Sequence, residues 1–242
     1  MLKKKQMGWI VFVLLFYFLF TPVVYGDLYW ESIVETGGAP EDMLKSMPKQ
    51  IRDKMLDQFK PKTEITKNYL KSFTLRSEQK GHIMIINYDT MTMYQIDTTK
   101  KTYTKINLLA AMDQIGPEVS EDMKVIATNE TKKIAGYKCT KYIVTVMGAK
   151  TEHWVSKDVE GYKEYREIRE KIEKKFKNNS SMGKMGMLDI SSEEGFPVKT
   201  VNDMMGIKST TTLKKIQKKS LSKDLFKIPE GYKLIEMKFP QQ

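Results

Sequence analysis

The spacing of apolar side chains predicts two substantial helices in a chain that is otherwise rich in strands. Within residues 40–59, apolar positions recur at spacings of three and four, which places them on one face of a helix. Pro40 suits the first helical position, and Pro61 ends the segment. A second helix is predicted over residues 159–177 on the same grounds. The two apolar stripes consist of Leu44, Met47, Ile51, Met55 and Phe59, and of Tyr162, Tyr165, Ile168, Ile172 and Phe176.

Most of the remaining chain alternates apolar and polar side chains with the period of two that is typical of strands. In the first predicted strand, which is long, Ile65, Tyr69, Phe73 and Leu75 are separated by even numbers of residues and so lie on one face. In the next strand, the residues on one face are His82, Met84, Ile86 and Tyr88. Further strands are predicted over residues 91–97, 102–106, 124–131, 137–147, 151–156, 197–204 and 209–216. Short helices are predicted near residues 108–115 and 222–226.

Short turns between consecutive strands indicate an antiparallel sheet of about nine strands, more than the usual four to six. A sheet of this size has to curl or split so that each strand buries one face. We therefore predict an α+β fold, mainly β, in which a curved antiparallel sheet (an incomplete barrel) wraps one or two helices. Neither an internal repeat nor an interdomain linker is evident, so residues 27–242 are predicted to form a single domain.

The N-terminus has the order of features that is typical of a secretory signal peptide. Lys3, Lys4 and Lys5 form a basic start, and residues 9–20 form an unbroken apolar run. Within residues 24–26, Val24 and Gly26 then place small side chains where a signal peptidase reads them. We predict a signal peptide over residues 1–26, cleaved near Gly26, and export to the periplasm or the cell exterior. The alternative is an uncleaved membrane anchor, although the apolar run is shorter than the about 20 residues that span a bilayer.

The composition is that of a folded domain, and it names no reaction. Of the 242 residues, 40% are hydrophobic and 10% are aromatic, which excludes a disordered chain. The single cysteine excludes a disulfide framework and a Cys-rich metal site. The sequence contains no phosphate-binding loop, dinucleotide-binding glycine pattern, nucleophile elbow or zinc-protease motif. We therefore expect a protein that is not an enzyme and carries no cofactor.

The net charge of +11 at pH 7 is compatible with an anionic partner, although a solvated basic surface explains it equally well. Such a charge attracts nucleic acid, anionic lipid or an anionic wall polymer. The lysines are scattered, and no basic motif interleaved with aromatic residues is present, so nucleic-acid binding is not expected. An anionic membrane surface is a candidate partner, and the sequence leaves the oligomeric state open.

Methionine is abundant, at 17 of the 242 residues. Methionine fills irregular gaps in cores, and the same flexibility suits a wall that adapts to an apolar ligand. The candidate residues for such a wall are Met55, Met84, Met93, Met112, Met147 and Met204. An alternative is a soft-metal site, because thioethers suit Cu(I). That site would consist of Met182, Met185 and Met187.

Cys139 is the one side chain that invites a catalytic interpretation. It lies within a predicted strand, where a free cysteine is usually a small buried apolar residue. As a nucleophile it would need a base, and the sequence places neither His82 nor His153 beside it. No catalytic residue is therefore predicted.

Three groups of residues carry a resemblance to a known family. They are residues 94–103 (Tyr-Gln-Ile-Asp-Thr-Thr-Lys-Lys-Thr-Tyr), residues 133–142 (Lys-Ile-Ala-Gly-Tyr-Lys-Cys-Thr-Lys-Tyr) with 152–157 (Glu-His-Trp-Val-Ser-Lys), and residues 195–200 (Gly-Phe-Pro-Val-Lys-Thr) with 225–232 (Leu-Phe-Lys-Ile-Pro-Glu-Gly-Tyr). In that order they resemble the bacterial exported domain-of-unknown-function family 4412, over residues 27–233. That family is similar in fold to the periplasmic lipoprotein carriers of the Lol type. The resemblance implies an incomplete antiparallel barrel that wraps helices around an apolar cavity for acyl chains.

These observations together favour an exported, non-enzymatic protein that binds or carries a hydrophobic ligand. The ligand would be a lipid or a lipoprotein acyl chain, held in the apolar cavity of a half-barrel. Two alternatives stay open at this point. One is a cell-surface structural or interaction module with a basic face, and the other is a Met/His soft-metal protein that binds copper.

Overall fold

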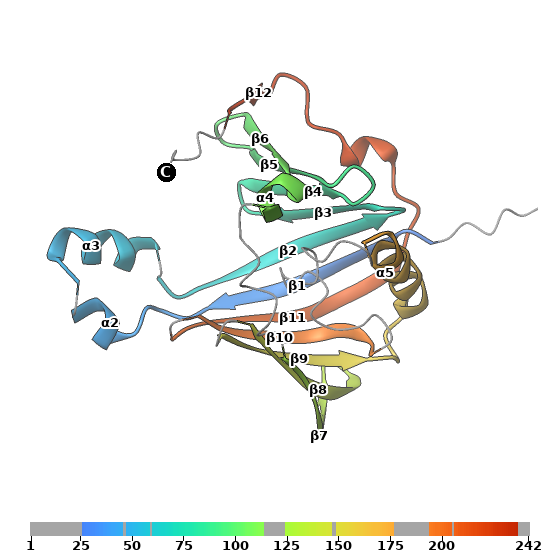
Figure 1. Cartoon of the computed structure of the whole chain (residues 1–242), viewed down its shortest axis with the longest axis horizontal. Coiled ribbons are helices and arrows are strands. Elements are labelled where there is room, and N and C mark those ends of the chain that lie inside the picture. Colours follow the sequence, from blue (N-terminus) through green and yellow to red (C-terminus); the bar gives the residue numbers. More distant parts are fainter. Residues whose placement is uncertain are drawn as a thin grey trace, which may run out of the picture.

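Twelve strands form one sheet in the part of the chain that the computed structural model describes (Figure 1). That part comprises residues 26–45, 47–58, 60–113, 124–146, 149–176, 194–204 and 206–236. The strands are β1 (Leu28–Thr36), β2 (Lys62–Lys71), β3 (Thr74–Gln79), β4 (His82–Asn87), β5 (Thr92–Asp97), β6 (Thr102–Asn107), β7 (Lys124–Ile134), β8 (Tyr137–Val146), β9 (Ala149–Ser156), β10 (Phe196–Met204), β11 (Ile207–Lys218) and β12 (Lys233–Leu234). Residues 1–25 of the predicted signal peptide lie outside the described residues.

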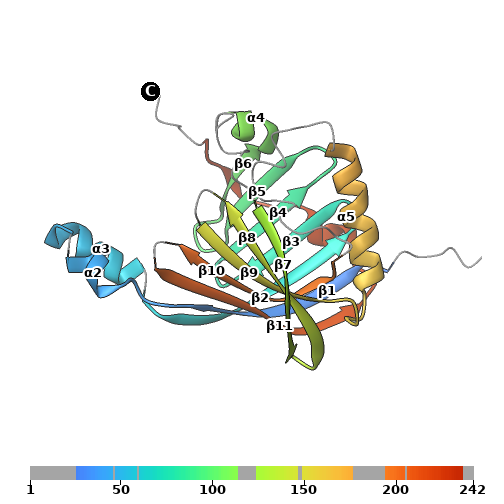
Figure 2. The same ribbon diagram turned by 60° about the horizontal axis from the view of Figure 1, so that its bottom comes forward.

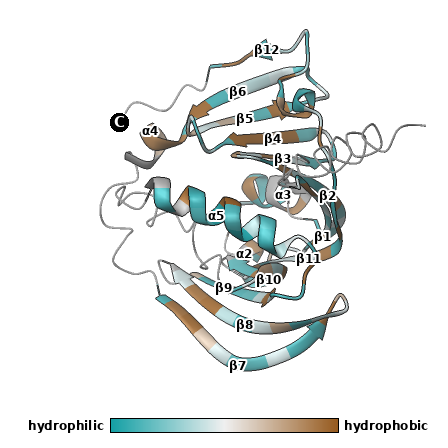
Figure 3. Cartoon of the chain, turned by 90° about the vertical axis from the view of Figure 1, so that its right-hand side faces the viewer, coloured by the Kyte–Doolittle hydropathy of each residue, from teal (hydrophilic) through white to brown (hydrophobic). Residues whose placement is uncertain are grey.

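The sheet is curved and does not close into a barrel. Its strand order is β12-β6-β5-β4-β3-β2-β1-β11-β10-β9-β8-β7, and neighbours run antiparallel except for β12, which is parallel to β6. Figure 3 shows helix α5 (Tyr162–Phe176) lying across the concave side. This confirms the predicted mainly β fold, an incomplete antiparallel barrel that wraps a helix, with more strands than the sequence suggested.

The sequence pattern missed β1, although this strand lies at the centre of the sheet between β2 and β11. The register with β11 shifts between Glu31 and Ser32, which marks a bulge. Both of these residues are buried, so burial along β1 does not alternate with a period of two. β12 was also missed, because two residues are too short to show a pattern.

The single long strand predicted across Ile65 and Leu75 is wrong, because the chain turns back within it. β2 ends at Lys71, and β3 begins at Thr74 and pairs antiparallel with β2. Ser72 lies in the turn with a φ of 52°, in the left-handed region that glycine usually occupies. No glycine or proline marks this turn in the sequence, and the alternation of side chains therefore predicted one continuous strand across it.

The first predicted helix is in fact two short helices, α2 (Glu41–Lys45) and α3 (Lys49–Gln58). The break falls at Pro48, which has no backbone N–H and cannot continue the first helix. The carbonyl of Pro48 instead accepts hydrogen bonds from the amides of Ile51 and Arg52, at 3.0 and 2.9 Å, and so begins α3. Figure 2 shows both helices beyond the ends of β1 and β2, away from α5. The sheet therefore wraps α5 and not this segment, and Ile51 is 51% exposed.

The second predicted helix is confirmed as α5, and its apolar stripe joins two core clusters. Ile168 and Ile172 pack with Ile86, Met91 and Leu108. The second cluster, which includes Cys139, Trp154, Val159, Phe196, Val198, Leu213 and Ile216, also contacts Tyr162 and Tyr165. α5 thus connects the two halves of the concave face. None of the described helices combines the length and the hydropathy that a membrane crossing requires.

The short helices predicted near residues 108–115 and 222–226 are observed as α4 (Leu108–Asp113) and the 3₁₀ helix η2 (Lys223–Phe226). η2 belongs to the C-terminal segment that runs from β11 to β12 (Figure 1). The guanidinium of Arg76 on β3 donates a hydrogen bond of 2.7 Å to the carbonyl of Leu225. Arg76 is buried, so this contact fixes the C-terminal segment against the sheet.

Candidate ligand-binding site

The inner face of the sheet is identified by α5, because Met84 and Ile86 of β4 belong to the same core cluster as Ile172. Directly paired residues of antiparallel strands share a face. The pairing of β2 to β6 therefore arranges the inner side chains in three rows across the strands. The first row is Leu70, Leu75, Ile86, Met93 and Ile106, the second is Asn68, Ser77, Met84, Gln95 and Thr104, and the third is Gln79, His82, Asp97 and Thr102. The inner wall thus changes from apolar to polar along the strands.

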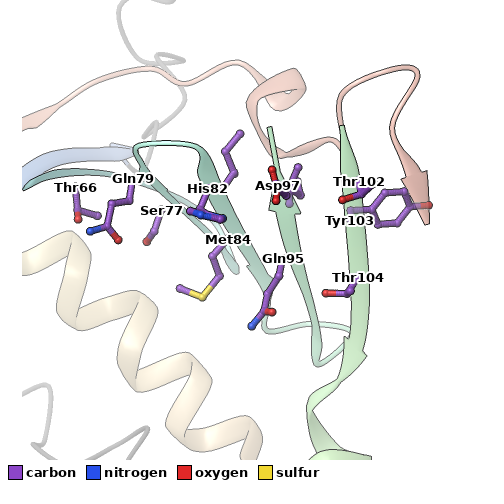
Figure 4. Close-up of a pocket in the computed structure, with 12 residues that line it drawn as sticks. Thr66, Ser77, Gln79, His82, Met84, Gln95, Asp97, Thr102, Tyr103 and Thr104 are labelled. Atoms are coloured by element: carbon purple, nitrogen blue, oxygen red, sulfur yellow. The ribbon is translucent and has the colours of Figure 1, made fainter. Parts of the chain in front are cut away.

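A cavity of about 570 Å³ lies at the second and third rows (Figure 4). All members of these rows except Asn68 line it, together with Thr66, Ile83, Ile96 and Tyr103. Its volume falls within the range of about 300–1,000 Å³ that is usual for small-molecule sites. The wall mixes apolar atoms with hydroxyl, amide, imidazole and carboxylate groups, so the cavity suits a ligand with both apolar and polar parts.

The hydroxyl of Thr104 is the polar group of this wall that most clearly lacks a partner. Its Oγ1 atom is buried and accepts or donates no hydrogen bond within the described residues. Leaving a buried polar group unsatisfied costs about 1–3 kcal/mol. By contrast, the Ser77 hydroxyl donates a hydrogen bond of 2.7 Å to Oδ1 of Asn68. A polar ligand atom beside Thr104 would remove the cost of its unpaired hydroxyl.

Asp97 places a fixed negative charge in the third row, opposite His82 on the neighbouring strand. Its Oδ1 atom accepts hydrogen bonds from the backbone N–H groups of Lys100 and Thr99, at 2.9 and 3.0 Å. The Lys100 ammonium lies 3.3 Å from Oδ2. These contacts, with the Lys100 N–H the strongest, hold the pKa of Asp97 below its ordinary value. The carboxylate is therefore ionised at neutral pH.

The structure brings together two of the six methionines that the sequence singled out. Met84 lines the cavity, and Met93 lies on the adjacent strand and packs against the same core cluster. The side chains of Met55, Met112 and Met204 lie outside the described part of the chain, as do Met147 and the candidate copper ligands Met182, Met185 and Met187. Those assignments stay predictions.

Sequence reasoning missed the polar residues of the wall. Gln95 and Asp97 share the parity of Met93, and His82 shares that of Met84, so alternation alone placed them on one face. Only the register between strands shows that these polar ends meet in one row. The sequence therefore shows which face each polar residue occupies within its own strand, but it does not show that these residues meet in one site.

Cys139 is fully buried in the second core cluster, and burial raises the pKa of its thiol. The protonated thiol is a poor nucleophile and a poor metal ligand. Within the described ranges, no three His, Cys, Asp or Glu side chains gather where they could hold a metal ion.

Solved structures share parts of this architecture at low sequence identity. PNGF-II aligns with a TM-score of 0.42 and 16% identity over 87% of this chain, which spans only 31% of the PNGF-II chain. A domain from Vibrio parahaemolyticus described as an outer membrane lipoprotein-sorting protein gives 0.38 and 10%, over 84% of this chain and 90% of that one. A DUF1329 family protein from Desulfovibrio piger gives 0.34 and 10%, over 85% and 91% of the two chains.

A search of curated proteins found no match to the chain. A family model described as Domain of unknown function (DUF4412) matches residues 42–232. The match runs from α2 to the segment after η2 and includes all three groups of residues that carried the resemblance. The resemblance is thereby confirmed: the chain belongs to the DUF4412 family.

Proposed function

We propose that this chain is an exported, non-enzymatic binding protein that holds an amphiphilic ligand, such as a lipid, against the concave face of its half-barrel. The observation that carries the proposal is the cavity of about 570 Å³ on β2 to β6. The second and third rows line the cavity, and the apolar first row lies next to them on the same face of the sheet. A ligand with an apolar and a polar end matches that arrangement, whereas a uniform hydrocarbon does not.

Burial of the apolar part of the ligand supplies the driving force. The hydrocarbon would contact the half-buried side chain of Met84, close to Met93 and the core cluster around Ile86. Burial of apolar surface contributes roughly 25 cal/mol per Å², so a few hundred Å² give several kcal/mol. The loss of translational and rotational freedom on binding offsets part of that gain.

The polar rows select the other end of the ligand. A hydrocarbon alone would leave the Thr104 hydroxyl and the Gln95 amide without partners in a desolvated site. The Asp97 carboxylate is already paired with the Lys100 ammonium, at 3.3 Å, so the pair adds no net charge that would select a charged headgroup. The wall therefore favours a neutral headgroup with hydroxyl or amide groups.

Export is part of the same proposal. It is supported by the basic start at residues 3–5, the apolar run at 9–20 and the small residues before Asp27. We place the mature domain at residues 27–242, with the signal peptide removed near Gly26. Contact with an anionic membrane surface stays a prediction from the net charge alone.

A charge placed in the cavity tests the binding site. Met84→Lys should weaken binding of a fluorescently labelled monoacylglycerol at least tenfold, because the new ammonium must be desolvated beside the hydrocarbon. Ile65→Lys is the matched control, since Ile65 is 45% exposed and adjoins the cavity residue Thr66 on β2, so it points to the opposite face. Fluorescence titration measures both, with circular dichroism to show that each variant is folded. Equal affinities for the two variants would contradict the proposal.

A further inference from the structure

Asp27, the first residue of the expected mature chain, is tied firmly to the body of the protein. Its side chain is almost fully buried, at 8% exposed, and Oδ2 lies 2.5 Å from the Lys71 ammonium. The same oxygen accepts a hydrogen bond of 2.9 Å from the backbone N–H of Leu221. The carbonyl of Asp27 accepts another, also 2.9 Å, from the N–H of Lys219. The position of the Asp27 nitrogen is therefore set by contacts that do not involve the residues before it.

A pocket of about 160 Å³ is lined by Gly26 and Asp27. The rest of its lining comes from Ser72 and Phe73 and from Glu164, Glu167, Ile168 and Lys171 of α5. A Cβ atom on Gly26 would lie 3.6 Å from Cβ of Lys218. The Lys218 ammonium lies 2.5 Å from Oε1 of Glu164. Gly26 thus rests along the stem of a lysine whose charged end is bound to α5.

The other carboxylate oxygen of Glu164 has no such partner. Oε2 is buried and makes no hydrogen bond among the described residues, and the side chain as a whole is 15% exposed. A buried carboxylate oxygen without a donor is more costly than an unpaired neutral group. Glu167 lies one helical turn further along the same side of the pocket. Lys71, Lys171 and Lys218 balance the three carboxylates around the pocket in number, so what it lacks among the described residues is a hydrogen-bond donor for Oε2 of Glu164.

We propose that this pocket is the docking site for the amino terminus created by signal-peptide cleavage. A protease of the export machinery would hydrolyse the Gly26–Asp27 peptide bond with water. The hydroxyl goes to the carbonyl carbon of Gly26, and a proton goes to the Asp27 nitrogen, which takes up a further proton at neutral pH. The resulting ammonium carries three N–H donors and pairs with Oε2 of Glu164 and with Glu167.

Processing then stabilises the exported form, because the new ion pair exists only after cleavage. The charged groups at the pocket are Asp27, Lys71, Glu164, Glu167, Lys171 and Lys218. Pairing with the two glutamates raises the pKa of the α-amino group above its ordinary value of about 7.7–8.0. The stabilisation is present below about pH 8 and is lost as the pH rises through the raised pKa of the folded state. The inference rests on the proposed export and is independent of ligand binding.

The test begins with the full chain, expressed in a bacterial host that exports it. N-terminal sequencing and intact mass of the purified protein should place the first residue at Asp27. An NMR titration of the Asp27 Cα resonance then gives the pKa of the α-amino group. We expect a value about one unit above the ordinary range, which is a tenfold gain in proton affinity.

Glu164→Gln should return this pKa to the ordinary range, and Glu170→Gln should leave it raised. Glu170 is a suitable control because it lies on α5 but pairs with Arg166, at 3.1 Å from its Nε atom. A mature chain that retains Gly26 provides a second test without any side-chain change, since its ammonium is displaced by about 3.8 Å. A first residue other than Asp27 overturns the proposal, and so does an ordinary pKa or one that Glu164→Gln does not lower. A first residue other than Asp27 also bears on the proposed processing, whereas an ordinary pKa on a chain that begins at Asp27 overturns this inference alone. None of these results bears on lipid binding.

Discussion

At the scale of single residues, the inner wall of the half-barrel departs from what stability alone would select. Thr104, on β6 near the edge of the sheet, buries a hydroxyl that makes no hydrogen bond among the described residues, where valine would pack equally well. The sequence pointed to the methionines of this wall, because their number stands out. It did not point to Thr104 or Gln95, because threonine and glutamine are ordinary strand and surface residues until the register aligns them.

Thr104→Val should therefore stabilise the free protein and weaken binding. Removing the unpaired hydroxyl should raise the free energy of unfolding by about 1 kcal/mol. Loss of one hydrogen bond to the ligand should weaken binding of the monoacylglycerol by about threefold to tenfold. Urea denaturation and fluorescence titration measure the two effects. A variant that is less stable, with unchanged affinity, would show that the hydroxyl serves the fold and not the ligand.

At the scale of elements, local patterns predicted what depends on local sequence. The apolar stripe of α5 and the hairpin strands β4 to β6 were foreseen because each follows its own period. β1 was not foreseen, because the bulge at Glu31 and Ser32 arises from pairing with β11, which lies far along the chain. The turn at Ser72 and the break at Pro48 were lost inside longer periodic segments. The prediction thus failed for β1, which depends on contacts distant in sequence, and at two local breaks that the apolar periodicity hides.

The start of α5 packs closely against β1, and alanine substitutions at two glycines test how tight this packing is. Gly161 precedes α5 with a φ of +84°, and a Cβ there would lie 2.5 Å from Cδ2 of Leu28, which is fully buried. Gly136 has a similar φ of +90° but nothing within 4 Å of its Cβ position. Both alanine variants pay about 1–2 kcal/mol for the left-handed backbone. Gly161→Ala should lose about 1–3 kcal/mol more, through overpacking against β1.

Thermal or urea unfolding of the two glycine variants provides the comparison. Because the backbone cost is nearly the same in both, the difference reports the close approach of the α5 entry to Leu28. Equal losses of stability would mean that this approach is not tight, and that α5 is held to the sheet by its apolar stripe alone.

At the scale of the whole molecule, an open sheet of this size creates a concave face that one helix only partly fills. α5 joins the core clusters of the two halves, and the cavity on β2 to β6 lies beside it on the part of the face that turns polar. Membership of the DUF4412 family leaves the ligand open. The sequence predicted the half-barrel and a binding role, but the polar half of the wall arises only when five strands are brought into register.

Native mass spectrometry of the exported chain, purified from cells without detergent, tests the binding account most directly. We predict an adduct of lipid-like mass on the wild-type protein that organic extraction removes and that Met84→Lys lacks. Ile65→Lys should retain the adduct, since its side chain lies on the opposite face. A bare protein mass, alongside a circular dichroism spectrum of a folded chain, would contradict the account.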